Sequence, residues 1–242
     1  MTSPRHTAMV TGIFFMFTIV ASIPAAYFFY TPVLGHPGYI TGPGADTRVS
    51  WGALLEIVTV VANIGTAVTL FPLLKRQNEG LALGYVAARI VESVVIVVGI
   101  LSLLAVVTLR QDLAGSGTDA ASLVTAGQSL VAVHDRTFLL GPGFLSGVGN
   151  GLMLGYLMYR SGLVPRRMAM LGLVGGPLVA MSGIAVLLGV YEQVSAWSAV
   201  ATLPEFAWEA SLAIYLMVKG FRPSAVAGLN AAPAMAGSAV GA

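Results

Sequence analysis

Ionisable side chains inside otherwise apolar segments are the residues of this sequence that could do chemistry. They are four glutamates and one arginine: Glu56, Arg89, Glu92, Glu205 and Glu209. Arg89 and Glu92 are three residues apart, so they share one face of a helix. The same holds for Glu205 and Glu209, which are four residues apart. Buried carboxyl groups can exchange protons or bind a cation, and a guanidinium can pair with one of them.

The charges of this set do not balance. Four carboxylates stand against one guanidinium, and the neighbouring Asp135 and Arg136 cancel, which leaves three negative charges. A protonated His134 would reduce the excess to two. Burial and repulsion between like charges both disfavour ionised carboxylates. We therefore expect at least one of these glutamates to hold a proton near neutral pH, or a cation to occupy the site.

Other polar residues extend the set. Asn63 lies on the same helical stripe as Glu56, Asn150 stands in an apolar segment, and Trp208 precedes Glu209. The candidates for binding a ligand or protons are Glu56, Asn63, Arg89, Glu92, His134, Asp135, Asn150, Glu205, Trp208 and Glu209.

A structural interpretation of these residues carries equal weight. Arg89 paired with a glutamate, and Asn63 and Asn150 in interhelical hydrogen bonds, would fix a helical bundle without binding anything. His134 alone is more typical of a hydrogen-bonded or solvated residue than of a ligand. With no cysteine and no second histidine in a predicted span, we expect no metal site. The sequence contains no hydrolase triad motif, phosphate loop or nucleotide fingerprint, so catalytic residues and cofactors stay unassigned.

Composition places the chain in a lipid bilayer. Of its 242 residues, 57% are hydrophobic and 9% are charged, against about 25% charged residues in a soluble domain. The mean hydropathy of +0.86 leaves too little polar surface to cover a globule in water, which excludes soluble enzymes and DNA-binding proteins. The pI near 9.0 reflects basic loop residues, so no nucleic-acid partner is expected.

Six apolar stretches are long enough to span a bilayer, which needs about 20 residues. They are roughly residues 8–30, 49–74, 80–109, 137–159, 168–191 and 197–218. The first is longer than the apolar core of a signal peptide, so we interpret it as an uncleaved helix. Eight basic residues lie at alternate span ends, namely Arg5, Lys75, Arg76, Arg160, Arg166, Arg167, Lys219 and Arg222. Only Arg48 and Arg110 lie at the others, which predicts cytoplasmic termini.

The predicted fold is therefore an all-α integral membrane protein with six transmembrane helices and both termini inside. Its parts are a cytoplasmic N-terminus at 1–7, a transmembrane domain at 8–222 and a disordered cytoplasmic tail at 223–242. A short interfacial helix within 119–136 is expected on the outer side before the fourth span. Residues 115–118, Gly-Ser-Gly-Thr, predict a flexible joint before it.

Glycines recur every four residues in the fourth span. Gly143, Gly147, Gly151 and Gly155 predict close packing against the fifth span, which offers Gly172 and Gly176. The run 141–143, Gly-Pro-Gly, allows two interpretations. It either frees backbone groups that line a cavity or simply begins the helix.

Three runs of residues carry a resemblance to a known family. They are residues 84–92 (GYVAARIVE), residues 149–166, which begin GNG and end YRSGLVPR, and residues 204–209 (PEFAWE), with KGFRP at 219–223 also fitting. Together they resemble the domain of unknown function 4386 family over nearly the whole chain, from the first span to Arg222. The resemblance implies a small multi-spanning protein of the bacterial cytoplasmic membrane. It implies no particular activity, and no binding or catalytic role comes with it.

Three hypotheses of function follow from these observations. The favoured one is small-molecule or ion binding, extending to proton-coupled transport, because the acidic excess suits protons or a cation. An accessory membrane protein whose polar network only sets the fold is the first alternative. The second is an intramembrane enzyme on a lipid or isoprenoid, with a protonated glutamate as general acid. The expected partners are the bilayer and a small-molecule, lipid or cation ligand, and the oligomeric state stays open.

Overall fold

The computed structural model describes residues 3–36, 38–115 and 120–238. This part of the chain consists of helices and connections, without strands. Three stretches, labelled η, are π-helices with a wider turn than the α-helix. The elements are α1 Pro4–Pro24, η1 Ala25–Phe29, α2 Thr31–Leu34, α3 Asp46–Leu74, α4 Glu79–Gly115, α5 Ala120–Leu140, η2 Gly141–Leu145, η3 Gly147–Leu154, α6 Gly155–Ser161, α7 Arg166–Leu187, α8 Ala196–Val218 and α9 Pro223–Ser238.

Five segments of the described chain are long and apolar enough to cross a membrane. They are Pro4–Phe29, Asp46–Leu74, Glu79–Leu113, Ala120–Ser161 and Arg166–Leu187. The chain is thus a multi-pass helical membrane protein. The sixth predicted span, α8, is not among them, because Glu205 and Glu209 lower its hydropathy.

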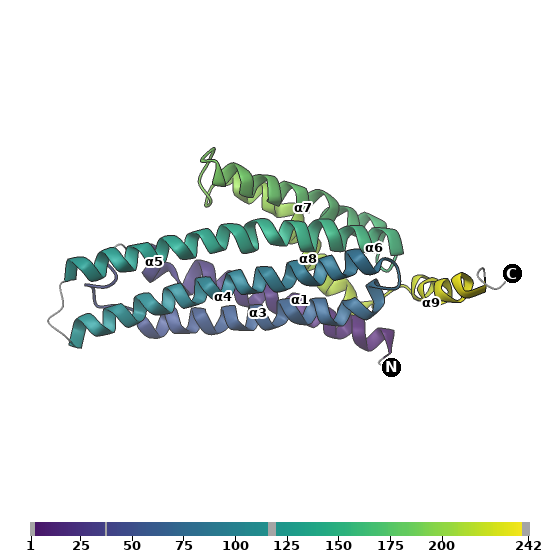
Figure 1. Cartoon of the computed structure of the whole chain (residues 1–242), viewed down its shortest axis with the longest axis horizontal. Helices are drawn as coiled ribbons and strands as arrows, with labels where there is room; N and C mark the ends of the chain where they lie inside the picture. Colours follow the sequence, from purple (N-terminus) through teal and green to yellow (C-terminus); the bar gives the residue numbers. More distant parts are fainter. Residues whose placement is uncertain (1–2, 37, 116–119, 239–242) are drawn as a thin grey trace.

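The helices form an elongated bundle with both termini at one end (Figure 1). We call this the terminal end and the opposite one the distal end. α1, α3, α4 and the long segment from α5 to α6 lie side by side, while the hairpin of α7 and α8 leans away from them toward its turn at 188–195 (Figure 1).

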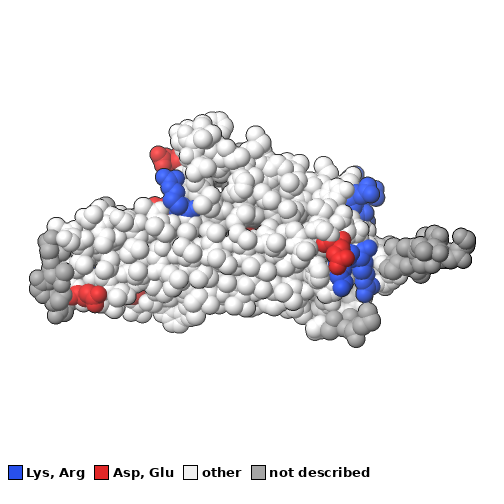
Figure 2. All heavy atoms as spheres, in the orientation of Figure 1, with Lys and Arg blue, Asp and Glu red and all other residues white. Residues whose placement is uncertain are grey.

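Basic residues gather at the terminal end, as Figure 2 shows for one face of the molecule. Arg5 is one of these residues, and it binds the end of α8. Its guanidinium donates hydrogen bonds to the carbonyls of Met217 and Val218, at 2.8 and 3.1 Å, where α8 ends. A cation at a helix C-terminus satisfies carbonyls that lack partners within the helix and complements the helix dipole.

A polar cluster fixes the loop at the distal end. Arg110 pairs with Asp46 at 2.7 Å and donates to the carbonyl of Pro43 at 2.5 Å, while Tyr39 donates to Asp46 at 2.8 Å. Burial, followed by the hydrogen bond to Asp46, raises the pKa of Tyr39, so its hydroxyl stays a donor.

The separate interfacial helix expected within 119–136 is not what the structure contains. Residues from Ala120 to Ser161 form one uninterrupted helical segment, because the apolar side of α5, including Leu130 and Val131, packs against Leu103 and Val106 of α4 instead of a membrane surface. At 37 residues, α4 is about 55 Å long and exceeds a hydrocarbon core of about 30 Å. Residues 116–118 of the predicted joint lie outside the described part.

The C-terminal tail also differs from expectation. Residues 223–238, expected to be disordered, form helix α9, in keeping with the helix propensity of their alanines. Val226 and Leu229 are buried, and Arg76 donates a hydrogen bond to Asn230. These contacts hold α9 at the terminal end. Residues 239–242 lie outside the described part.

Glycines bring the fourth and fifth spanning segments into close approach. A Cβ atom on Gly147 would lie 2.6 Å from the carbonyl oxygen of Gly176 and 3.1 Å from the nitrogen of Ala180 in α7. Gly151 faces the backbone of Gly176 as well, and a Cβ on Gly155 would lie 3.1 Å from the nitrogen of Leu173. Only hydrogen side chains permit this distance between the two backbones.

Gly147→Ala should therefore lower the free energy of unfolding by about 1–3 kcal/mol, since the added methyl group forces the two segments apart. Thermal unfolding in detergent measures the loss. The matched control is Gly84→Ala, because a Cβ there would meet only the flexible end of the Met153 side chain, at 3.5 and 3.7 Å. Equal stability of the two variants would contradict the close approach.

Candidate functional site

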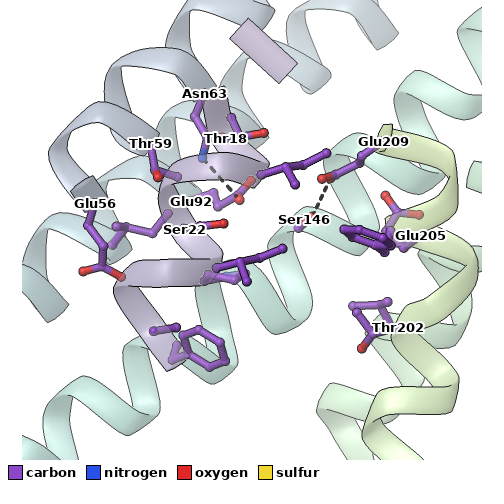
Figure 3. A pocket seen from close by; sticks show the side chains of 18 of the residues that line it. Thr18, Ser22, Glu56, Thr59, Asn63, Glu92, Ser146, Thr202, Glu205 and Glu209 are labelled. Atoms are coloured by element: carbon purple, nitrogen blue, oxygen red, sulfur yellow. Dashed lines mark hydrogen bonds between the residues drawn. The ribbon is translucent and has the colours of Figure 1, made fainter. Parts of the chain in front are cut away.

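Six of the ionisable and amide residues named from the sequence line one cavity of about 190 Å³. They are Glu56, Asn63, Arg89, Glu92, Glu205 and Glu209. Figure 3 shows the α3 and α4 side chains on one side and those of α8 on the other, with Ser146 between them. α3, α4 and α8 thus bring residues far apart in sequence to one space, and α1, η1, α5, η2 and α7 also contribute to its walls.

Arg89 is held between two partners at one side of the cavity. It is 2% exposed and lies 2.8 Å from the Glu92 carboxylate, one helical turn further along α4. A second guanidinium nitrogen donates to the side-chain oxygen of Asn63, whose amide nitrogen donates to Glu92 at 3.4 Å. The three side chains form a closed ring of hydrogen bonds, so the charge of Arg89 is neutralised by Glu92.

Asn150 holds Glu209 at the other side. Its amide nitrogen donates to the Glu209 carboxylate, which also accepts from Ser146 at 3.4 Å. Tyr85 donates to the side-chain oxygen of Asn150 at 3.4 Å, and the indole of Trp208 donates to the backbone carbonyl of Asn150 at 3.1 Å. Glu209 is therefore oriented by neutral donors and not by a cation.

Glu205 has neither a paired cation nor a neutral hydrogen-bond donor. Its side chain is buried, with the residue 3% exposed, and neither carboxylate oxygen forms a hydrogen bond. The carboxyl group lies against glycines, because a Cβ on Gly151 or on Gly175 would come within 2.5 or 2.9 Å of its Oε2. An ionised carboxylate in this position would be strongly destabilising, so Glu205 requires a proton or a ligand.

Glu56 occupies the distal part of the cavity. Tyr30, at the end of η1, donates a hydrogen bond to its carboxylate at 2.9 Å. The ring of His134 packs edge-on against Tyr30 with 5.6 Å between ring centroids. His134 is buried but lines a small void beside Glu56 rather than the main cavity.

The remaining candidates lie outside the cavity. The side chain of Asp135 is 60% exposed, and Arg136 is exposed too, so neither contributes charge to the site. Asn150 and Trp208 are fully buried behind the wall and act on it through hydrogen bonds.

The charges around the cavity remain unequal in the structure. Arg89 pairs with Glu92, Arg110 pairs with Asp46, and the His134 ring lies 3.6 Å from the Asp135 carboxylate. None of them neutralises Glu56, Glu205 or Glu209. The described part of the chain contains no group of three His, Asp or Glu arranged to hold a metal ion. The three carboxyl groups therefore lie at the cavity without a cationic side chain paired to them among the described residues.

Two irregular helical stretches shape the cavity. η1 contributes Ala26 and Tyr27 to the wall, and η2 contributes Pro142. Proline lacks the N–H that an α-helix needs, and π-helical turns often occur at functional sites. Pro142 stands inside the continuous helical segment and lines the cavity, so the helix-start interpretation of residues 141–143 is wrong.

The first helical segment and Tyr30 directly after it contribute a part of the site that is not among the residues predicted from the sequence. Thr18 and Ser22 line the cavity, and Tyr30 binds Glu56. The spacing of Thr18 and Ser22, four residues apart on one face and followed by Pro24, was a signal available in the sequence.

The comparisons with known proteins concern the chain as a whole. A family model described as Domain of unknown function (DUF4386) matches residues 10–220. The chain belongs to the DUF4386 family. The match runs from α1 to the end of α8, so it includes every residue of the cavity in this DUF4386 protein. No curated protein and no solved structure matches the chain.

The buried ion pair can be tested by a double-mutant cycle in the DUF4386 protein. Arg89→Ala should lower the free energy of unfolding by about 3–5 kcal/mol, because it leaves Glu92 buried without a cation. Arg89→Ala combined with Glu92→Gln should lose less than the two single variants together, by about 1 kcal/mol or more. Unfolding in mixed micelles measures both quantities.

The control is Arg136→Ala, which removes an exposed cation and should change stability by less than about 0.5 kcal/mol. Strict additivity of the Arg89 and Glu92 variants would mean that the two side chains do not interact.

Proposed function

We propose that this DUF4386 protein binds a small organic cation in the acidic cavity, in exchange for protons. The observation that carries the proposal is the buried Glu205 carboxyl group, which faces the cavity without a hydrogen-bond partner. Glu209, one helical turn away, faces the same space. A cation with N–H donors would supply the bonds that Glu205 lacks and the positive charge that the cavity lacks.

The size and lining of the cavity favour a small ammonium ion. A volume of about 190 Å³ holds about six water-sized groups of ~30 Å³ each. Phe206 and Tyr27 also line the space, and aromatic rings attract ammonium groups through their negative faces.

Proton exchange follows from the balance of charge. With no cation bound, protons on the carboxyl groups provide the neutralisation that a low-dielectric site demands. When a cation binds, one of these protons becomes superfluous and leaves. Such exchange is the elementary step of proton-coupled transport, which is the extended form of this proposal.

The membrane arrangement that accompanies this function has six spans and cytoplasmic termini, in a bacterial plasma membrane. α8 has 23 residues, about 35 Å, which suffices for a core of about 30 Å once its glutamates face the cavity and not lipid. The gathering of Lys and Arg at the terminal end supports its cytoplasmic orientation.

The other two hypotheses receive less support. An accessory protein with a purely structural network would have a solid centre and paired charges, whereas this protein has a cavity and an unpartnered Glu205. Intramembrane chemistry on a lipid is favoured by one observation, the exposed faces of Ile23 and Phe206 at the cavity wall. Mass spectrometry of ligand recovered after incubation separates binding, which returns it unchanged, from catalysis.

The binding proposal is tested with n-butylammonium and protein in lipid nanodiscs. Glu205→Gln and Glu209→Gln should each weaken its binding, measured by calorimetry, by at least about tenfold. Asp135→Asn is the matched control, because that carboxyl group is exposed and should leave the affinity unchanged. Heats measured in buffers of different ionisation enthalpy should show release of about one proton per cation. Equal affinity in all four proteins would reject the proposal.

The topology is tested with single cysteines, since the chain has none of its own. Val194→Cys lies in the turn between α7 and α8 and should react with an impermeant maleimide on intact cells. Ser224→Cys, in α9, should react only after permeabilisation. Labelling of both from the same side would contradict the arrangement.

A further inference from the structure

The acidic cavity has a side on which its lining residues are exposed. Ile23 and Tyr27 of the first helical segment are 42% and 65% exposed, and Phe206 of α8 is 42% exposed, although all three line the cavity. The neighbouring surface is apolar as well, with Val20 58% and Leu203 64% exposed. The cavity therefore opens sideways between α1 and α8, through a surface suited to lipid rather than to water.

The two helices that flank this opening are in close contact on its terminal side. A Cβ on Gly12 of α1 would lie 2.7 Å from the carbonyl oxygen of Ala213 in α8, so the backbones are in close contact there. Further toward the distal end, Ile23 and Tyr27 on one helix and Phe206 on the other are separated by the cavity. Pro24 and the π-helical turn after it fall in this stretch.

Polarity changes along the path from the opening inward. The aliphatic and aromatic side chains at the mouth give way to Glu205 and Glu209 inside. A ligand that matches this gradient carries a positive charge at one end and a hydrocarbon chain at the other. The cavity has room for about six water-sized groups only, so a long chain must leave it through the opening.

We propose that the ligand of this site is a cationic amphiphile with a single alkyl chain, which reaches the cavity from the bilayer between α1 and α8. Its ammonium group lies between Glu205 and Glu209, and its chain passes Ile23 and Phe206 into the lipid. This inference rests on the proposed cation binding and adds the class of ligand and its route.

A second depression gives the alternative route. It lies at the distal end, and its lining includes Asp135 and Glu192 as well as Tyr27 and Phe138, which it shares with the cavity. A ligand arriving there would come from water and would have to fit into the cavity completely. Chain length therefore separates the two routes.

The experiment measures displacement of radiolabelled n-butylammonium from the protein in zwitterionic nanodiscs. For the lateral route, n-decylammonium should half-displace the label at a concentration about a hundredfold lower than unlabelled n-butylammonium, because its added methylene groups leave water for lipid. The neutral alcohol 1-decanol, which enters the same bilayer, should not displace the label. Because only bound label is counted, decylammonium dissolved in the lipid does not register as binding.

A substitution at the opening tests whether the alkyl chain of n-decylammonium passes there. Ile23→Trp should raise the half-displacing concentration of n-decylammonium about tenfold, while n-butylammonium affinity stays within about twofold, since the short ion fits inside. The matched control is Ile184→Trp, which adds the same bulk to an exposed isoleucine of α7 that does not line the cavity. Retained n-butylammonium binding shows that each variant is folded.

The outcomes separate the inference from the proposed function. Failure of n-decylammonium to displace the label, or displacement no better than by n-butylammonium, would overturn the amphiphile while leaving cation binding in place. Equal displacement by 1-decanol would overturn it as well. If n-butylammonium itself does not bind to the unmodified protein, both proposals fall. The comparison of chain lengths in that protein holds even if Ile23→Trp does not fold.

Discussion

The free energy of placing carboxyl groups in a low-dielectric interior constrains the rest of this structure. Four glutamates face one cavity, and a single arginine is available to them. Both terminal nitrogens of Arg89 bind Glu92 and Asn63, while its buried Nε has no partner, so the other three carboxyl groups depend on neutral donors or on none. A bundle that must bury such groups has to supply protons, donors or a ligand, because an unpaired charge there costs several kcal/mol.

The helices meet this constraint in two different ways. Glu56 and Glu209 accept hydrogen bonds from Tyr30 and Asn150. Glu205 instead lies against a glycine surface, where no side chain competes for its oxygens. Glu56 and Glu209 are thus each held by a neutral donor, whereas Glu205 is not. The glycines of η3 and α7 therefore do more than permit close helix packing. They also leave room for the Glu205 carboxyl group and for the proton or ligand that neutralises it.

Irregular backbone creates the space itself. The π-helical turns after Pro24 and around Pro142 contribute to the cavity walls, and the inclined hairpin of α7 and α8 keeps α8 away from α1 on the distal side. Lipid offers backbone groups no hydrogen bonds, so irregular helices persist in a membrane only where protein or a polar cavity surrounds them. The same irregularities leave a lateral opening.

Much of this arrangement could be predicted from the sequence, and the exceptions have physical reasons. The family, the helical membrane fold and the charged residues inside it followed from residue runs, hydropathy and charge position. The direction in which each side chain turns cannot be predicted from these patterns. Asp135 is therefore a candidate by sequence although its side chain is exposed.

The π-helical turns and the continuous helix through Leu140 depend on contacts between distant segments, which a local pattern does not contain. The same holds for α9, where alanine-rich composition suited both disorder and a helix held by Arg76.

The most direct test of the central claim is infrared spectroscopy of the carboxyl stretch at neutral pH, in nanodiscs without added organic cation. The account predicts a protonated-carboxyl band that is smaller in Glu205→Gln than in the unmodified protein and that declines when n-butylammonium is added. A spectrum without such a band, or a band that neither Glu205→Gln nor the cation alters, would show that the buried acidic excess is not neutralised at Glu205 and would contradict the account.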